Sequence, residues 1–261
     1  MLRLALQMLY GDRAKYVMLV SGLAFCALLM SQQTSVFCGL LRWTTATVRN
    51  IGAPVWISDA KVDQVNEVVA LREIELQRVR SVAGVEWAVP LYWNILQARL
   101  PDGTFQTIQL TGLDSATFVG RPAKMTEGRF EDLRLPNTVV VDQVAIEKFR
   151  KRGIKLEVGT VFEINDREAR VVGICETERS FLGQPYVYTT YDRALEYAPP
   201  VRKPLSFILA KPAAGIEVVE LKRRIALLEG LVARDEDDFA HETLWWYIRN
   251  TGIPISFGTV V

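Results

Sequence analysis

One stretch near the N-terminus constrains this chain more than any other feature, because it contains no charged residue. Lys15 is followed by 26 uncharged residues, 16–41, before Arg42 restores a charge. A helix rises about 1.5 Å per residue, so about 20 residues cross the ~30 Å hydrocarbon core of a bilayer. Residues 16–41 are therefore predicted to form a transmembrane helix, with the lipid bilayer as a direct partner.

A cleaved signal peptide is the competing interpretation of this stretch. Arg3, Arg13 and Lys15 resemble the basic start of such a peptide. The residues after Met30 offer no clean pair of small residues for cleavage, which favours a retained anchor. Residues 31–35 (Ser-Gln-Gln-Thr-Ser) are polar. They indicate the point where the helix reaches water on the far side of the membrane, or alternatively a face that forms hydrogen bonds with another helix.

The first residues of the chain carry a separate short pattern. Leu2, Leu6 and Leu9 recur at helical spacing, so residues 1–12 are predicted to form a cytoplasmic amphipathic helix. A frayed terminus is the alternative. The distribution of Lys and Arg around the apolar stretch slightly favours a cytoplasmic N-terminus, which would put the downstream region across the membrane.

An aromatic cluster and an uncharged tail stand at the other end of the sequence. Trp245, Trp246 and Tyr247 form a group of the kind that lies at membrane interfaces. Arg249 is followed by 12 uncharged residues, which are too few to span a bilayer. We expect residues 249–261 to be the start of a truncated second transmembrane helix; a strand tucked into a core is the alternative.

Residues 42–248 carry most of the charges and turn signals, and they are predicted to form a mixed α+β domain. Residues 101–103 (Pro-Asp-Gly) and 165–166 (Asn-Asp) predict two hairpin turns. Gly84 and Gly230 are expected to cap the helices before them. The expected strands are residues 54–57, 85–100, 105–113, 138–141, 161–164, 169–174, 186–188, 205–210 and 231–233. The expected helices are 144–150 and 216–228, together with a broken helix of imperfect helical spacing at 63–82.

The order strand, helix, glycine, strand occurs twice, at residues 55–87 and again at residues 205–233. Two such units at the ends of one domain predict a ferredoxin-like pair with a β-rich insertion between them. The similarity lies in element order and not in residues. The fold class is therefore predicted as α+β, with an N-terminal transmembrane helix in front.

Composition and side-chain placement argue against catalysis. His241, the single histidine, has no Ser or Cys partner at local spacing, and residues 235–238 (Asp-Glu-Asp-Asp) lack the glycines of a calcium loop. Cys26, Cys38 and Cys175 show no disulfide framework and are expected to be buried free thiols. Because the sequence has no glycine-rich phosphate loop, we predict no catalytic, cofactor-binding or metal-binding residues. Lys and Arg total 31 against 30 Asp and Glu, so no basic excess points to nucleic acid.

Several short segments resemble one family. They are residues 127–130 (Glu-Gly-Arg-Phe), 137–142 (Asn-Thr-Val-Val-Val-Asp), 158–159 (Val-Gly) and 170–174 (Arg-Val-Val-Gly-Ile). Behind an anchor helix, they resemble the periplasmic core of permease subunits of MacB-type ABC transporters, the MacB/FtsX/LolC superfamily. The segments that resemble the DevC-like branch most closely are residues 30–37, 78–90, 184–191 and 251–258.

The resemblance covers nearly the whole chain and implies a MacB-like periplasmic core domain with a noncatalytic role. The chain would be the permease subunit of an ABC exporter in a bacterial inner membrane, coupling a separate ABC ATPase to movement of the periplasmic domain. Further implied partners are a membrane-fusion adaptor with its outer-membrane duct, and a second permease in a homodimer. The cargo would be an efflux or lipid-type substrate. Family members continue with three more membrane helices.

Two other classes of function stay open at the level of the sequence. A single-pass membrane-anchored periplasmic sensor or scaffold needs only the anchor and a domain that binds a partner. A secreted or anchored enzyme needs a nucleophile and a base, and residues 42–248 offer no such pair. Neighbouring genes for an ATPase and an adaptor would favour the permease.

Overall fold

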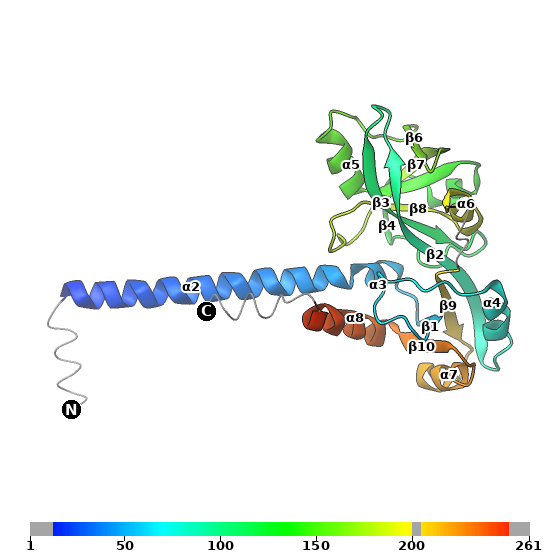
Figure 1. The fold of residues 1–261 in the computed structure, drawn as a ribbon, viewed down its shortest axis with the longest axis horizontal. Coiled ribbons are helices and arrows are strands. Elements are labelled where there is room, and N and C mark those ends of the chain that lie inside the picture. The colour runs from blue at the N-terminus through cyan, green and yellow to red at the C-terminus, as the bar shows by residue number, and fades with distance from the viewer. Residues whose placement is uncertain (1–12, 200–204, 251–261) are drawn as a thin grey trace.

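The computed structural model describes residues 13–199 and 205–250, which form a long stalk helix and a two-lobed body (Figure 1). The stalk, α2 (Arg13–Thr44), is one continuous helix of 32 residues and a candidate membrane span by length and composition. It contains the predicted span at residues 16–41 and extends it at both ends. The predicted helix at residues 1–12 and nearly all of the predicted segment 249–261 lie outside the described residues.

The ferredoxin-like lobe contains the two predicted strand–helix–strand units. Its elements are β1 (Val55–Asp59), α4 (Glu73–Arg80), β2 (Val85–Arg99), β9 (Phe207–Pro212), α7 (Val218–Ile225) and β10 (Leu231–Asp235). The strand order is β10–β1–β9–β2, and every pairing is antiparallel. Val55 and Ile57 of β1 share one buried apolar cluster with Val79 of α4 and Leu221 of α7, so both helices cover the same face. The predicted ferredoxin-like arrangement is confirmed.

The β-rich lobe is the predicted insertion, and its strands close into a ring. The elements are β3 (Phe105–Leu113), β4 (Lys124–Gly128), the 3-10 helix η1 (Phe130–Arg134), β5 (Thr138–Asp142), α5 (Gln143–Arg150), β6 (Val161–Ile164), β7 (Arg167–Glu176), β8 (Tyr186–Thr190) and α6 (Tyr191–Tyr197). Going round the ring, β2 pairs with β3, then β8, β5, β7 and β6 follow, and β6 returns to β2. Strand β4 is added to the outside of β7. An apolar core that includes Phe149 and Tyr197 belongs to this lobe.

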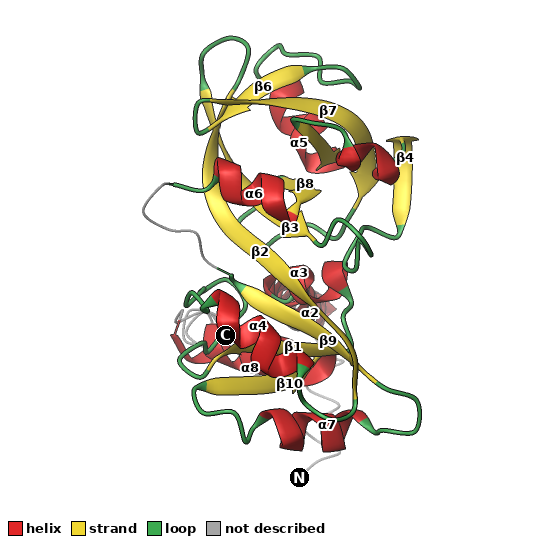
Figure 2. Cartoon of the chain, turned by 90° about the vertical axis from the view of Figure 1, so that its right-hand side faces the viewer, coloured by secondary structure: helices red, strands yellow, loops and turns green. Residues whose placement is uncertain are grey.

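Strand β2 joins the two lobes, as Figure 2 shows. Its residues 85–91 pair with β9, and its residues 92–99 pair with β3. A third apolar cluster lies between the lobes and contains Trp56, Trp93 and Tyr188 together with Val48 of α3 (Ala46–Ile51). The lobes therefore share a strand and a core, and the short helix that follows the stalk packs into that core.

Both predicted hairpins are present. Residues 101–103 turn β2 into β3, and Asn165 and Asp166 turn β6 into β7 with positive φ angles of 51° and 61°. Asn and Asp tolerate this left-handed conformation better than other non-glycine residues, which explains why the sequence signal is reliable.

The predicted helix at residues 63–82 is wrong in its first part, because only Glu73–Arg80 is helical. Val65 is fully buried in the core between the lobes, and its backbone N–H donates to Thr243 Oγ1 (3.2 Å) on α8 (Glu236–Asn250). The apolar residues of this segment thus serve packing against distant elements, and the apparent helical spacing does not reflect a helix. The sequence analysis did not anticipate α8.

The expected glycine caps are also wrong. Ser81 closes α4 and Ala226 closes α7, both in the right-handed conformation. Gly84 and Gly230 have positive φ angles and turn the chain into β2 and β10 instead. Among the cysteines only Cys175 is buried, whereas Cys26 and Cys38 lie exposed on the stalk.

Candidate functional site

The residues that connect the stalk to the body form the most elaborate polar site of the described chain. At the end of α2, the Arg42 guanidinium lies 2.5 Å from Glu178 Oε1. Two helical turns later, Arg49 Nε donates to Glu178 Oε2 (2.9 Å). Glu178 lies between β7 and β8, so one carboxylate of the β-rich lobe is held by two cations of the helical segment.

Charge and burial act in opposite directions on this carboxylate. Partial burial of Glu178 raises its pKa, while the hydrogen bonds and charges of Arg42 and Arg49 lower it. The net pKa lies below the ordinary value, so the carboxylate stays ionised at neutral pH. Arg49 also donates to Thr45 Oγ1 and to the Arg42 carbonyl, which fixes its position across the α2–α3 junction.

A second contact joins α3 to the same loop. The Asn50 amide Nδ2 donates to the Glu178 carbonyl (2.9 Å), and the Glu178 backbone N–H donates to Asn50 Oδ1 (2.8 Å). Thr47 and Tyr186 share a buried hydroxyl–hydroxyl hydrogen bond of 3.0 Å. We call the group Arg42, Arg49, Asn50 and Glu178 the stalk clamp; it attaches the root of the stalk to the β-rich lobe.

The ferredoxin-like lobe is held by α8. Phe239 packs against Trp56 and Phe207 with ring centroids 5.5 and 5.8 Å apart. Arg234 of β10 donates to Ser58 Oγ and to the Val62 carbonyl, both at 2.9 Å, and pairs with Glu242 of α8. Because these contacts come from several strands and a loop, α8 is firmly attached to this lobe.

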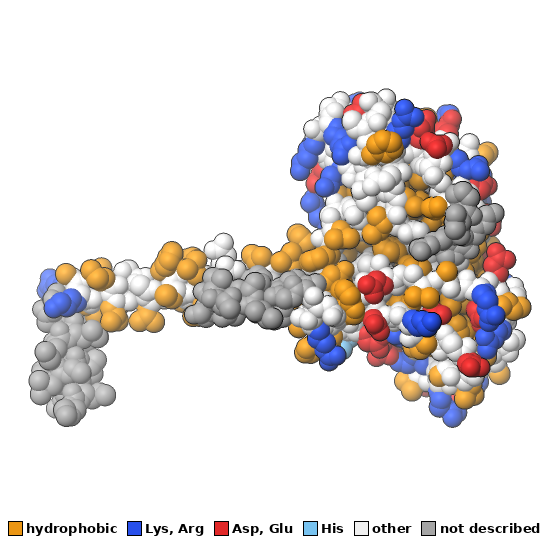
Figure 3. All heavy atoms as spheres, in the orientation of Figure 1, with side chains coloured by type: hydrophobic (Ala, Val, Ile, Leu, Met, Phe, Trp, Pro, Cys, Tyr) orange, Lys and Arg blue, Asp and Glu red, His pale blue; other side chains and the backbone are white. Residues whose placement is uncertain are grey.

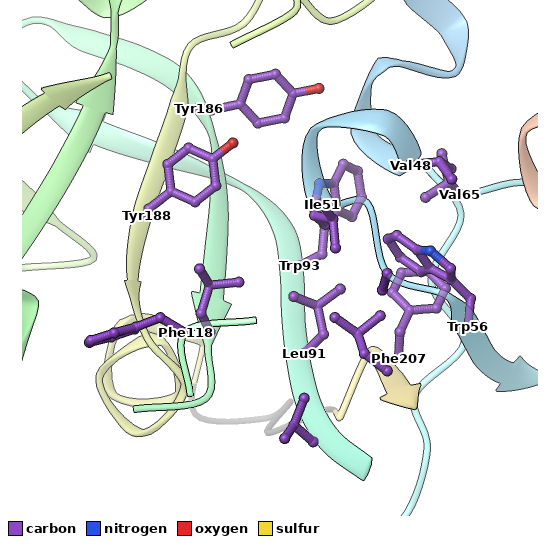
Figure 4. Close-up of a cluster of buried hydrophobic side chains, with 14 of the residues drawn as sticks. Val48, Ile51, Trp56, Val65, Leu91, Trp93, Phe118, Tyr186, Tyr188 and Phe207 are labelled. Carbon is purple, nitrogen blue, oxygen red and sulfur yellow. The ribbon is translucent and has the colours of Figure 1, made fainter. Parts of the chain in front are cut away.

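The stalk, α3 and α8 meet at one place, so the root of the stalk contacts both lobes. Helices α2 and α3 each contact α8, and in Figure 1 α8 lies beside the body end of the stalk. Phe181 of the β7–β8 loop packs on Tyr247 of α8 with ring centroids 5.1 Å apart. Figure 4 shows the apolar core under this junction, where Val48 and Ile51 of α3 face rings from both lobes.

A buried carboxylate lies next to the stalk clamp. Asp142 accepts from the backbone N–H of Ala145 (3.0 Å) and caps α5, and Thr177 Oγ1 donates to its other oxygen (3.3 Å). Burial raises the pKa of Asp142 to about 7 from an ordinary value of 3.8, although these hydrogen bonds lower it. Thr177 precedes Glu178 in the chain, so its hydrogen bond to Asp142 fixes the start of the loop that carries the clamp.

The residues that the sequence analysis weighed for chemistry are spread over the body. His241 Nε2 accepts from Trp245 Nε1 (2.6 Å) on the exposed side of α8. Two carboxylates of the acidic run 235–238, those of Asp235 and Asp238, each lie 2.5 Å from the Lys222 Nζ of α7. Within the described ranges, no group of three His, Cys, Asp or Glu side chains is placed to hold a metal ion.

Comparison with known families identifies the body. The family described as the MacB-like periplasmic core domain matches over residues 30–228. The chain belongs to this family. Its members are parts of MacB-type ABC transporter permeases, so the chain is a component of an ABC transporter of this type. Together with the apolar helix α2, membership indicates a membrane-anchored protein with a periplasmic domain.

Solved structures support the same fold. The periplasmic region of MacB from Actinobacillus actinomycetemcomitans superposes with a TM-score of 0.53 at 17% identity, covering 78% of this chain and 96% of that one. The extracellular domain of the ABC-type transporter YknZ from Gram-positive bacteria gives 0.52 at 12% identity, covering 70% and 99%. At these identities the likeness concerns the fold alone. A comparison with curated proteins finds no match.

The family-like segments of this MacB-like domain have a structural explanation. Residues 127–130 cover the end of β4 and the start of η1, and residues 170–174 lie on β7. Strands β4 and β7 pair with each other. Gly128 has φ +72°, and a Cβ there would lie 2.0 Å from the Val172 carbonyl oxygen. A Cβ on Gly173 would lie 2.6 Å from the Met125 methyl group. These glycines permit close approach of two strands, so the motif has a structural role in this fold.

The stalk clamp was missed by sequence reasoning. Arg42 and Arg49 are seven residues apart, which is two helical turns, and this spacing could have pointed to a shared face. Their partner Glu178 is 136 residues from Arg42 and resembles any other surface glutamate in the sequence. The identity of the carboxylate partner therefore had no signal that a single sequence could reveal.

Proposed function

We propose that this chain is the permease subunit of an ABC exporter. In this role it couples a separate ABC ATPase on the cytoplasmic side to a periplasmic domain, and through that domain to a membrane-fusion adaptor and an outer-membrane duct. The cargo class we propose is an efflux or lipid-type substrate, and we propose that two permeases form a homodimer. The protein itself does not hydrolyse ATP.

The observation that carries this proposal is the direct attachment of the stalk to both lobes. Helix α2 continues through α3 into the core, and the stalk clamp and the α8 contacts hold its root on two sides. A displacement of the membrane helix would then move the body as a unit, because bending between the stalk and the body would break several hydrogen bonds at once. Such a link suits a mechanical coupler.

The topology within the membrane belongs to the same proposal. We propose a cytoplasmic segment at residues 1–12, a membrane helix at residues 16–41, a periplasmic domain at residues 42–248 and the start of a second membrane helix at residues 249–261. Helix α8 extends toward the side of the body from which the stalk projects, which supports a return to the membrane there (Figure 1). The DevC-like branch is the subgroup that we propose.

The test is an ATPase measurement with a partner. The permease, completed with the further membrane helices that the resemblance implies, is reconstituted with its cognate ATPase in proteoliposomes. Intact permease should raise or regulate ATP turnover, whereas Leu6→Lys with Leu9→Lys should reduce this effect while the periplasmic domain stays folded. An ATPase that never associates with the permease would refute the proposal.

A single-pass sensor or scaffold is the second candidate. It is favoured by the stalk being the one candidate span among residues 13–199 and 205–250. A pull-down from membranes that yields a periplasmic partner and no ATPase would support this reading over the permease.

A further inference from the structure

The loop between β7 and β8, which contacts the root of the stalk, presents an exposed leucine. The turn at residues 180–183 is closed by a Gly183 N–H to Ser180 carbonyl hydrogen bond (2.9 Å), and Ser180 Oγ also bonds to Gln184 (3.2 Å). Phe181 packs inward on Tyr247, whereas Leu182 remains 52% exposed. The closed turn holds this apolar side chain outward, where entry into an apolar environment would be favourable.

The length of the stalk determines what this loop faces. Lys15 and Arg42 border the uncharged run, and at about 1.5 Å per residue they are separated by about 40 Å. A bilayer with its headgroups is about 40–45 Å thick, so Arg42 lies at the level of the outer headgroups when Lys15 lies at the inner ones. Glu178 binds Arg42 directly, and the turn at residues 180–183 follows it immediately.

Other side chains around the stalk root have the composition of a membrane interface. Trp43 on the stalk is 41% exposed and Trp245 on α8 is 43% exposed, and Trp is the residue that anchors proteins at headgroup level. Figure 3 shows hydrophobic side chains gathered where the stalk meets the body. The Arg42 and Arg179 side chains pair with Glu178 and Glu147 but remain 68% and 48% exposed, so each can also contact an anionic headgroup.

We propose that the turn at residues 180–183 rests on the lipid bilayer, with Leu182 inserted among the headgroups in the same interfacial layer as Trp43 and Trp245. The inference relies on the membrane anchoring that is part of the proposed function, and it adds a second attachment of the body to the membrane. The turn lies in the same loop as Glu178, which belongs to the stalk clamp. Contact between the turn and lipid would therefore orient the β-rich lobe relative to the stalk.

Depth measurement by electron paramagnetic resonance tests the proposal. The chain carries Cys26→Ala and Cys38→Ala, a nitroxide at Leu182→Cys, and the buried Cys175 unchanged, in nanodiscs of phosphatidylethanolamine and phosphatidylglycerol (3:1). We expect the ratio of collisions with oxygen to collisions with a water-soluble nickel chelate to be several-fold higher than for the matched variant Leu227→Cys. Leu227 is 84% exposed and follows α7, away from the stalk (Figure 1).

Two results would overturn the proposal. A nitroxide at residue 182 that collides with the chelate as freely as one at residue 227 would show a loop in water. A nitroxide shielded from both reagents only in discs with two chains would show that a second copy covers the loop. Because the readout involves no ATPase, a failed coupling experiment leaves this result standing, and a failed depth experiment leaves the permease proposal standing.

Discussion

Asn50→Ala removes the two-way amide contact by which α3 holds the β-rich lobe. The Asn50 side chain accepts from the Glu178 N–H at 2.8 Å and donates to the Glu178 carbonyl at 2.9 Å. One protein hydrogen bond contributes about 0.5–1.5 kcal/mol, so the loss of two destabilises this contact by about 1–3 kcal/mol. Since about 1.4 kcal/mol is a factor of ten, local opening of residues 177–186 should become about 5–150-fold more populated.

Hydrogen exchange measured by mass spectrometry on the full chain in nanodiscs reports this opening. Amides in residues 177–186 and in α3 should exchange faster in Asn50→Ala, while β1, β9 and β10 should keep the rates of the unmodified protein. Gln97→Ala is the matched control, because it removes an exposed amide that bonds to Thr107 Oγ1 (3.1 Å) on the far part of β2. Unchanged exchange in residues 177–186, or an equal increase throughout the body, would refute a local clamp.

Other substitutions test the core, the buried carboxylate, the glycine motif and the domain limits. Phe239→Ala should lower the free energy of unfolding by about 3–5 kcal/mol, because its ring packs against both Trp56 and Phe207. The loss would be measured as a lower midpoint of guanidinium denaturation, and a loss below about 1 kcal/mol would contradict this packing. Burial raises the pKa of Asp142 from 3.8 to about 7, so the folded state keeps its proton where the unfolded state has lost it, and the contribution of this group to stability is lost as the pH rises from about 4 to about 7. The difference in Tm between Asp142→Asn and the unmodified protein should therefore shift in favour of the variant between about pH 4 and pH 7 and level off above pH 7, and a constant difference would argue against a buried titrating carboxylate. Both Gly128 and Gly153 have positive φ, but only a Cβ at residue 128 would clash, so Gly128→Ala should lower Tm more than Gly153→Ala. Equal decreases in Tm would mean that strand β4 shifts to make room for the added methyl group. A fragment of residues 44–250, which keeps α3 and α8 whole, should be monomeric and melt cooperatively; a fragment that is insoluble without detergent would contradict an independently folding domain.

The fold was largely predictable because its signals are local. The hairpins at residues 101–103 and 165–166 follow from turn residues between alternating segments, and the repeated strand–helix–strand order yields the ferredoxin-like lobe. The helix prediction at residues 63–82 failed in its first part for an equally physical reason, and was confirmed at Glu73–Arg80. Val65 belongs to a core between lobes, and apolar residues that face a distant partner can mimic helical spacing without forming a helix.

The candidate site was predictable only in part. The apolar stretch indicated where the stalk would be, and the basic residues after it indicated where the stalk would end. The carboxylate that receives Arg42 and Arg49 had no such signal, because ion pairs between residues far apart in the chain leave no periodic pattern. The aromatic cluster at residues 245–247 was visible, but its attachment through Phe181 to the β-rich lobe was not.

The sequence by itself determined the features that depend on neighbouring residues: a long uncharged helix, the hairpin turns, the ferredoxin-like order and the glycines of β4 and β7. The tertiary structure decided how distant pieces combine. It closed the β-rich strands into a ring through β6, ran β2 through both lobes, and brought Glu178 to the root of the stalk. The physical reason is that backbone preference and amphipathic spacing act over a few residues, whereas strand pairing and ion pairing are selected by the packing of the whole chain.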